Sequence, residues 1–274
     1  MTIAAAYLVP DGVVFGTDGE TKVLDKKGTL QQTHNNTPQI FPIEEVTNAW
    51  FAICCWGSPQ VGMFSHRSVA ARLKNQLGNL DSIAIVDKVK SIITAMVEET
   101  RNKGKINYNA GNFGYFLGGV NPNSHRPFCL QLNFQGDGLL FKEKEEERTK
   151  KSMELEEGEF RLAGGQDGLS SLLLGYDEAV KNRLITALKQ RMPNDVECEK
   201  LVVDALRQET AALEYDMIPL RSAVDSLYTH LCVAARLKRR NEKVQGASGA
   251  TEICVISPDK PFRRIDTPFQ GFTL

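Results

Sequence analysis

Hydrophobic residues along this chain follow two different periods, and the change from one to the other predicts a fold that mixes strands and helices. Short apolar runs cover residues 2–9 and 13–17, and the Pro-Asp-Gly segment 10–12 between them has the composition of a tight turn. A second pair of apolar runs covers residues 39–43 and 50–56. The last run does not alternate with polar residues, so we expect a strand that is buried on both faces.

Helical spacing of apolar residues predicts two consecutive helices after these strands. In residues 58–77 the apolar stripe consists of Val61, Phe64, Val69, Leu73 and Leu77. Asp81 is placed to cap the next helix, residues 81–97. Later runs predict strands at 113–120, 127–134, 139–142 and 160–163, helices from about 169, at 195–213 and at 220–240, and strands at 252–257 and 262–265.

This order of elements predicts an α+β fold with mainly antiparallel sheets, because hairpins rather than βαβ units connect the strands. Two sheets between helical layers would bury the strands that are apolar on both faces. No linker divides the sequence, so we expect one domain over residues 1–274. The charged segment at about 142–159 is interpreted as a solvated insertion, a hairpin tip or loop, rather than an acidic binding tail.

Charge and hydropathy exclude some classes of function. The 274 residues carry a net charge of −1, so there is no basic field to attract nucleic acid. No run approaches the ~18 apolar residues of a membrane helix, and the apolar N-terminal segment has no basic leader of a signal peptide. We therefore expect a cytoplasmic protein without nucleic-acid or membrane partners.

Cysteine and glycine patterns give no metal or cofactor site. The six cysteines form no CxxC pair and have no histidine at metal-binding spacing, so we expect them reduced and buried, with Cys54 and Cys55 on opposite faces of a strand. The glycine-rich segment 164–168 lacks the Lys-Ser/Thr ending of a P-loop. The sequence therefore predicts no metal and no cofactor.

Thr2 is the first candidate for catalysis. Once Met1 is removed, Thr2 has a free α-amine. An α-amine has a pKa near ~7.7–8.0, so it can take the proton of the Thr2 hydroxyl at neutral pH. Threonine at a second position is common and means little by itself. The following sequence adds weight: Thr2 leads into a strand, a glycine turn follows, and the next apolar strand ends at Asp18, 16 residues after Thr2.

These features resemble the opening of proteasome β subunits, which are N-terminal-nucleophile (Ntn) hydrolases. Further pieces in the same order resemble that family: the glycine after strand 50–56, the hairpin 113–134, the turn 162–165 and the final helix and strand. The resemblance is to a bacterial-type proteasome-like protein. It implies a four-layer αββα sandwich, a threonine-type peptidase acting on peptides or unfolded proteins, a homo-oligomeric ring and an ATPase partner.

The resemblance also implies a degenerate site. The family's lysine falls at Gln39, which supplies no charge. Its oxyanion-hole glycine falls at Trp56 or one residue later at Gly57, and its supporting serine falls at Gly164. Near the C-terminus only Ser248 matches, loosely.

Three functions remain open at this stage. The first is a weakened or inactive threonine peptidase in which Thr2 attacks, Asp18 orients the site and the backbone near Trp56 and Gly57 holds the oxyanion. The second is an inactive structural or binding protein that keeps the fold and a ring assembly. The third is an Ntn amidase that acts on a small amide.

Overall fold

The computed structural model of the chain describes most of its strands and helices. The residues described are 3–19, 21–24, 30–34, 38–43, 51–74, 76–77, 81–103, 112–121, 124–135, 138–139, 154–155, 157–164, 178–191, 218–241 and 251–265. No described helix has the length and hydropathy that crossing a membrane requires.

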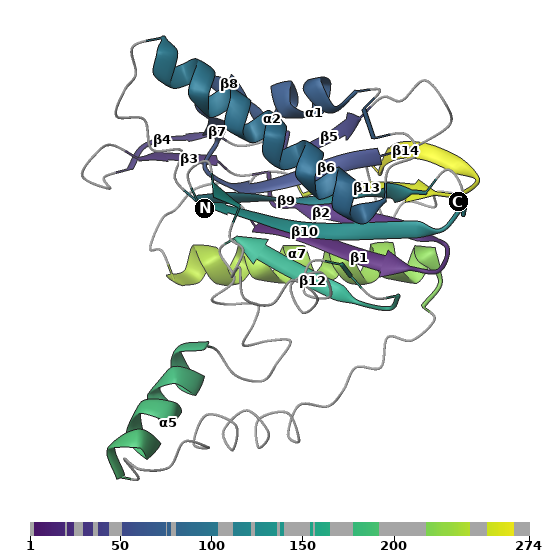
Figure 1. The fold of residues 1–274 in the computed structure, drawn as a ribbon. Coiled ribbons are helices and arrows are strands. Elements are labelled where there is room, and N and C mark those ends of the chain that lie inside the picture. Colours follow the sequence, from purple (N-terminus) through teal and green to yellow (C-terminus); the bar gives the residue numbers. More distant parts are fainter. Residues whose placement is uncertain are drawn as a thin grey trace.

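Two five-stranded antiparallel sheets form the centre of the molecule (Figure 1). Sheet 1 has the order β12-β1-β2-β13-β14, with bounds Phe160–Gly164, Ile3–Val9, Gly12–Thr17, Glu252–Ser257 and Lys260–Ile265. Sheet 2 has the order β11-β10-β9-β6-β5, with bounds Gly138–Leu139, Pro127–Gln135, Asn112–Val120, Phe51–Gly57 and Ile40–Ile43. These strands begin and end close to where the sequence predicts them, except that residues 140–142 of the strand expected at 139–142 lie outside the described residues.

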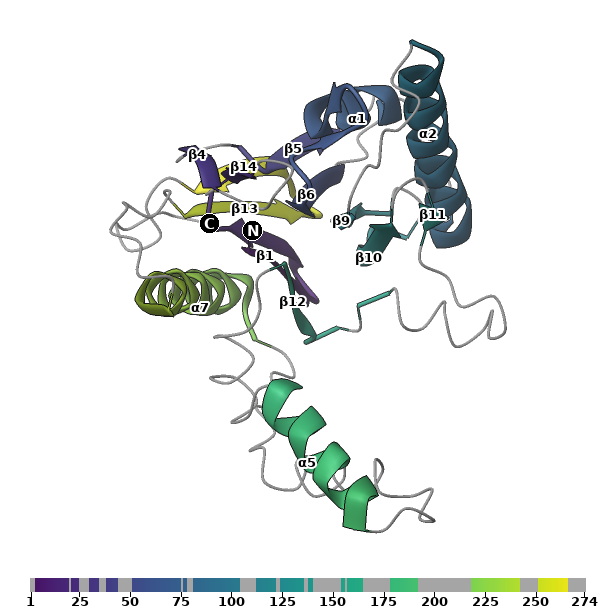
Figure 2. The same ribbon diagram turned by 90° about the vertical axis from the view of Figure 1, so that its left-hand side faces the viewer.

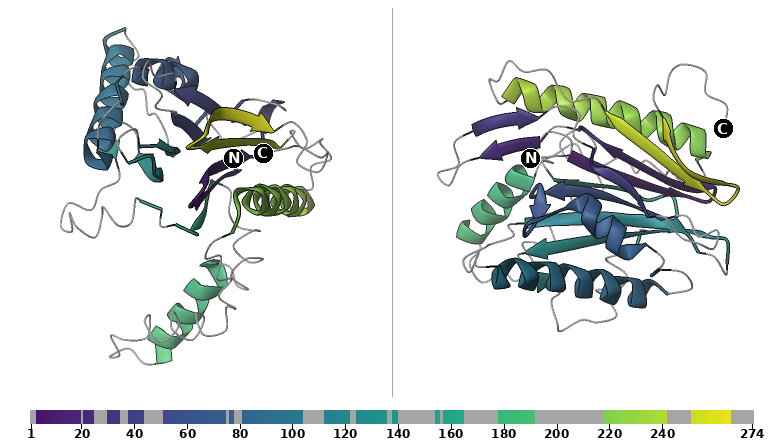
Figure 3. Two further views of the ribbon diagram at one scale, coloured as in Figure 1. Left: turned by 90° about the vertical axis from the view of Figure 1, so that its right-hand side faces the viewer. Right: turned by 90° about the horizontal axis from the view of Figure 1, so that it is seen from above.

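Helices cover the outer face of each sheet. Against sheet 2 lie α1 (His66–Leu73) and α2 (Ser82–Asn102), and against sheet 1 lies α7 (Leu220–Asn241), as Figures 2 and 3 show. Asp81 caps α2 as predicted, accepting the backbone N–H of Ala84 at 2.8 Å. A further helix, α5 (Glu178–Arg191), lies apart from the sandwich (Figure 1). The helix expected at 195–213 lies outside the described residues.

Three hydrophobic clusters separate the four layers. One lies between sheet 2 and helices α1 and α2, the second between the sheets, and the third between sheet 1 and α7. Cys54 belongs to the inter-sheet cluster and Cys55 to the cluster beneath α1 and α2, so the two cysteines are buried on opposite faces of β6 as predicted. The chain therefore has the four-layer αββα sandwich of the Ntn hydrolases.

The predicted helix at 58–77 is wrong in its first half. A two-stranded hairpin, β7 (Gln60–Val61) with β8 (Phe64–Ser65), precedes α1. Gly62 makes the turn with φ +65°, and a Cβ there would lie 2.1 Å from Oγ1 of Thr100 on α2. Close packing against α2 therefore overrides the helical spacing of the apolar residues. A second small hairpin pairs β3 (Thr21–Leu24) with β4 (Leu30–His34).

Candidate active site at one end of the sandwich

One end of the sandwich brings together most of the residues singled out from the sequence. Strand β1 starts here at Ile3, β2 ends at Thr17 directly before Asp18, and β12 ends at Gly164, which pairs with Ile3. From sheet 2, β5 follows Gln39 and β6 ends at Gly57. We call this region the site end. Thr2 and Ser248 lie outside the described residues.

Asp18 is held against the start of β1. Its carboxylate accepts the backbone N–H of Ile3 at 3.1 Å, and its own N–H donates to the Ile3 carbonyl at 3.2 Å. The side chain is only 2% exposed. A buried carboxylate is thus fixed at the residue that directly follows Thr2, and hydrogen bonds of this charge-assisted kind are roughly twice as strong as neutral ones.

Gln39 is bonded into the core. It is 5% exposed, and its side-chain Oε1 accepts the thiol proton of Cys55 at 2.9 Å. The Gln39 carbonyl accepts the Cys55 N–H at 2.9 Å, while the Gln39 N–H donates to Glu252 at 3.2 Å. Because the Cys55 side chain lies in the cluster beneath α1 and α2, this bond draws the Gln39 amide toward that core. Position 39 therefore brings packing and a neutral hydrogen bond, and no charge.

A carboxylate–guanidinium pair that sequence reasoning missed joins the two sheets beside Gln39. Arg264 on β14 donates to the Glu252 carboxylate and to the backbone carbonyl of Ile40 at 3.0 Å. Burial raises the pKa of Glu252 above its usual range, although the Gln39 N–H and Arg264 oppose that change. The sequence signal for this pair was the presence of two opposite charges, Glu252 and Arg264, on the expected C-terminal hairpin. Their contact with β5 cannot be inferred from the sequence.

The cysteines near the site end are not activated as nucleophiles. Burial raises the pKa of the Cys55 thiol, and the nearby Glu252 carboxylate adds to the effect. Burial is also the main cause of the raised pKa of Cys54. A reactive cysteine needs the opposite shift, toward the thiolate. Thiol catalysis therefore has no support here.

Trp56 packs against β9. Its indole is 8% exposed and lies 4.7 Å from the Phe116 ring, measured between centroids. Gly114 faces it in the register of the two strands, and a Cβ on Gly114 would come within 2.3 Å of the indole. The tryptophan therefore fills part of the inter-sheet core.

Strand geometry distinguishes the backbone of Trp56 from that of Gly57. The Ser58 N–H donates across to Asn112 on the β9 side, whereas the Cys55 N–H donates to Gln39 on the β5 side. Successive N–H groups of a strand point to alternate sides. The Gly57 N–H therefore points to the β5 side, beyond the first residue of that strand, and the Trp56 N–H points toward β9. Gly57 has φ +87°, and a Cβ there would lie 2.3 Å from the Asn112 carbonyl oxygen.

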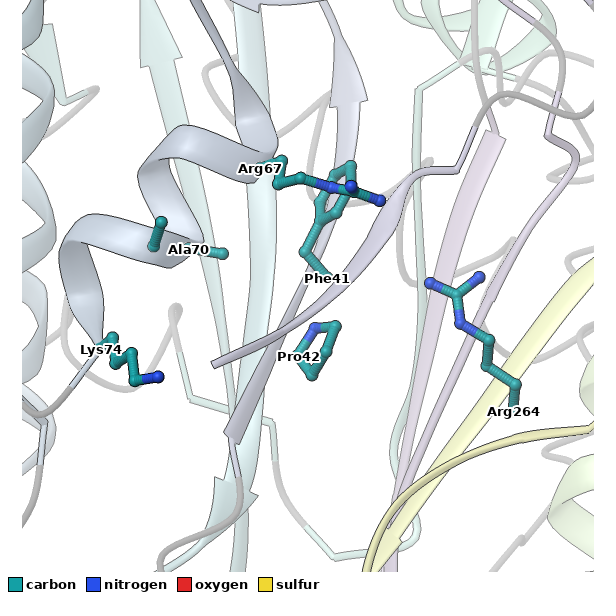
Figure 4. Close-up of a pocket in the computed structure, with 7 residues that line it drawn as sticks. Phe41, Pro42, Arg67, Ala70, Lys74 and Arg264 are labelled. Atoms are coloured by element: carbon teal, nitrogen blue, oxygen red, sulfur yellow. The ribbon is translucent and has the colours of Figure 1, made fainter. Parts of the chain in front are cut away.

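A separate pocket of about 430 Å³ lies between α1 and the edge strand β5 (Figure 4). Its lining is Phe41, Pro42, Arg67, Ala70, Ala71, Lys74 and Arg264. The Arg67 guanidinium stacks over the Phe41 ring at 5.8 Å from its centroid. The pocket is basic and apolar, and none of its lining residues is a nucleophile or a general base at neutral pH. We therefore place the candidate chemistry at the site end. In the described part of the chain, no cluster of three or more His, Cys, Asp or Glu side chains could hold a metal ion.

Comparison with solved structures identifies the fold. The Anbu (Gly-1) mutant from Hyphomicrobium sp. strain MC1 is 12% identical, with a TM-score of 0.52 over 97% of this chain and 87% of that chain. The Anbu complex from Pseudomonas aeruginosa, solved as a helical assembly, is 10% identical, with a TM-score of 0.51 over 94% and 81%. Anbu from Yersinia bercovieri, described as an ancestral β-subunit, has 11% identity and a TM-score of 0.48 over 98% and 89%. No family model and no curated protein matches the sequence.

These neighbours correct the family that the sequence suggested. They are Anbu proteins, whose proteasome-like Ntn fold is related to the bacterial-type proteasome β subunit but distinct from it, so the assignment to that subunit family is wrong. The reason lies in the features on which it rested. A strand near the chain start, an aspartate directly after β2 and a glycine at the end of β6 are short local features of the sandwich described above. They identify the fold, and they do not separate families within it.

Proposed function

We propose that this chain is a slow threonine-type hydrolase that cleaves amide bonds of peptides or unfolded proteins with Thr2, once Met1 has been removed. One observation carries the proposal. The buried Asp18 carboxylate accepts the Ile3 N–H at 3.1 Å, which fixes an acidic group one residue from the nucleophile. Burying a carboxylate costs free energy because it loses its hydration. Beside an N-terminal amine that must hold and release a proton, the negative charge stabilises the protonated amine.

The mechanism follows from the alternation of β1. Ala4, Ala6 and Leu8 lie in the inter-sheet cluster, and in the two-residue repeat of a strand, position 2 of the sequence belongs to the same set as these three residues. The α-amine of Thr2 takes the proton of Oγ, and Oγ attacks the substrate carbonyl. The Gly57 N–H, which points away from β9, is the donor we assign to the resulting oxyanion.

The reaction should be slow because the described residues of sheet 2 place no cation beside the nucleophile: Gln39 is neutral, and its side chain is bonded to Cys55. Loss of one electrostatic group at an oxyanion or nucleophile typically costs ~10²–10³ in rate. Arg264 does bring a positive charge close to β5, but its guanidinium is paired with Glu252 and bound to the Ile40 carbonyl. It therefore serves to join the sheets.

The second candidate is a subunit that assembles without catalysis. The Gln39–Cys55 hydrogen bond favours this candidate. Catalysis would need a charged side chain at position 39, whereas Gln39 is neutral and packs against Cys55. Under either function we propose homo-oligomeric assembly, as a ring or a helix, since the Pseudomonas aeruginosa neighbour was solved as a helical assembly. A chamber formed in this way would favour unfolded-protein substrates, delivered by an ATPase, over a small amide.

Hydrolysis assays on the full chain test the proposal. Fluorogenic peptide amides, an unfolded protein and small amides should be compared with wild type and Thr2→Ala, after intact mass has shown whether Met1 is gone. We expect slow turnover of peptides that Thr2→Ala abolishes. Equal rates for both proteins would leave the non-catalytic subunit, and turnover of small amides only would favour the amidase.

A further inference from the structure

His66, the first residue of α1, has a defined role in hydrogen bonding at the site end. The imidazole is 4% exposed. Its Nδ1 lies 2.8 Å from the Tyr115 hydroxyl, and its Nε2 lies 2.7 Å from the Ser58 carbonyl oxygen. Because a carbonyl can only accept, Nε2 carries the proton and Nδ1 accepts from the phenol. Tyr115 on β9 thus selects the tautomer that donates to the turn after β6.

The surroundings keep this imidazole neutral. The rings of Tyr115 and Phe113 lie 5.4 and 6.0 Å from it, measured between centroids. Burial lowers the pKa of His66 to about 4, so the donating tautomer persists at neutral pH. Both ring nitrogens are engaged, which leaves His66 no capacity to act as the base for Thr2.

The carbonyl that His66 holds belongs to the residue after Gly57. Ser58 is fixed on three sides: its N–H donates to Asn112 at 3.0 Å, its hydroxyl donates to the Gln60 carbonyl at 3.0 Å, and its carbonyl accepts from His66. The first two partners are the first residues of strands β9 and β7. Among the described hydrogen bonds of Ser58, the one from His66 links the turn to the helical layer. The Ser58 N–H and carbonyl belong to the peptide groups on either side of Ser58, so Asn112 and His66 together hold the two successive peptide groups that lead out of Gly57.

We infer that His66 is a positioning residue, which holds the Gly57 N–H in the direction that an oxyanion requires. The inference rests on the proposed function, in which that N–H is the donor. Preorganised donors act because they need no reorientation during the reaction. A histidine that served packing alone would need a ring of this size but no proton on Nε2.

Acylation by an activated ester tests this inference. With an N-acylated tripeptide p-nitrophenyl ester, the Thr2 Oγ bonds to the ester carbonyl carbon, the bond to p-nitrophenolate breaks, and the hydroxyl proton passes to the α-amine. The released p-nitrophenolate gives the rate, and intact mass confirms one acyl group. The variants are His66→Phe, which keeps a ring without a donor, His66→Gln, which can still donate, and Tyr115→Phe. His230→Phe on α7 is the matched control.

We expect His66→Phe to lower the maximal acylation rate by about 10- to 100-fold, with little change in the ester concentration that gives half of it. His66→Gln should recover much of the loss, Tyr115→Phe should fall between, and His230→Phe should match wild type. Should His66→Phe fail to fold, the other two variants decide. A wild-type acylation rate in His66→Phe, or no recovery of the rate in His66→Gln, would overturn the inference about His66 and leave the proposed function standing. A wild type no faster than Thr2→Ala would overturn the proposed function and this inference with it.

Discussion

The two sheets contribute differently to the site end. Sheet 1 brings the start of β1 and a buried carboxylate, Asp18, that is bonded to the backbone of Ile3. Sheet 2 brings a shaped turn at Gly57, but its residue at position 39 is neutral and is bonded to the core thiol of Cys55. Under the proposed function, sheet 1 supplies the carboxylate beside the start of β1, while sheet 2 supplies the shape of the turn and no charge.

This difference means that the shape and the charge of the proposed site rest on different features of the molecule. Strand ends, turns and register follow from packing of the whole sandwich, so they persist as long as the core does. The charge at one position depends on a single side chain. Gln39 has a structural role instead of a charge, because its hydrogen bond to Cys55 satisfies the buried side-chain amide oxygen.

Gly57→Ala should have the largest effect on stability. The added Cβ would meet the Asn112 carbonyl oxygen at 2.3 Å, in a backbone conformation of φ +87°. We expect a loss of about 3 kcal/mol or more in the free energy of unfolding, from crowding and positive φ together. Urea unfolding gives the value, and Gly158→Ala, at a similar φ of +84°, is the control for backbone conformation. A loss no larger than the control's would mean that sheet 2 does not fix the turn.

Asp18→Ala should cost somewhat less. It leaves the Ile3 N–H buried without its carboxylate partner, and we expect a loss of about 2–3 kcal/mol. Asp18→Asn can keep the hydrogen bond without the charge, so it should cost about 1 kcal/mol while still reducing the acylation of Thr2. If Asp18→Asn reacts as fast as wild type, the charge on sheet 1 has no catalytic role, and the contrast between the sheets disappears.

Gln39→Lys tests whether charge can be restored to sheet 2. Because the Gln39 side chain is drawn toward Cys55 in the core beneath α1 and α2, we expect the variant to lose about 2 kcal/mol of stability without a gain in acylation rate. Gln39→Met, of similar length and neutral, separates the lost hydrogen bond from the buried charge. A clear rise in acylation rate in Gln39→Lys would show that position 39 can still face the nucleophile.

The smallest effect concerns Glu252, which joins the sheets. Its pKa is raised in the folded state, so the folded chain holds this proton more readily than the unfolded chain. Its contribution to stability is therefore complete below the unfolded-state pKa and is lost as pH rises through the folded-state pKa. Relative to Glu252→Gln, wild type should lose about 1 kcal/mol or less over that interval. The check is urea unfolding at stepped pH, with exposed Glu98→Gln as control. An opposite slope would mean that pairing with Arg264 outweighs burial.

Local patterns were enough to predict most of the fold. The apolar runs that became β1, β2, β6 and β9 are buried on both faces, and a strand of that kind is visible in the sequence without knowledge of its partners. The β7–β8 hairpin was not predicted, because its turn depends on the contact between Gly62 and Thr100 on α2. Such contacts join residues far apart in the chain, and periodicity does not report them.

The site was less predictable than the fold. Asp18 lies beside the start of β1 because of the register of the β1–β2 hairpin. The number of residues between the two strand ends in the sequence can suggest that register. The direction of the Gln39 side chain depends on Cys55, and the joining of β5 to β14 depends on Glu252 and Arg264 from the other sheet. The role of His66 likewise depends on its two partners in the fold. Side-chain partners across layers decide these features, and one sequence does not specify them.

The pH dependence of Thr2 acylation tests the central claim most directly. If sheet 2 places no cation beside the nucleophile, the α-amine of Thr2 should titrate near or above the value of an ordinary α-amine, raised by the Asp18 carboxylate. The p-nitrophenyl ester should therefore acylate the chain with a midpoint at or above that of a Thr-Ile-Ala peptide titrated under the same conditions. A midpoint clearly below that of the peptide would contradict the account, because a neighbouring cation or burial of the amine would then outweigh the Asp18 carboxylate.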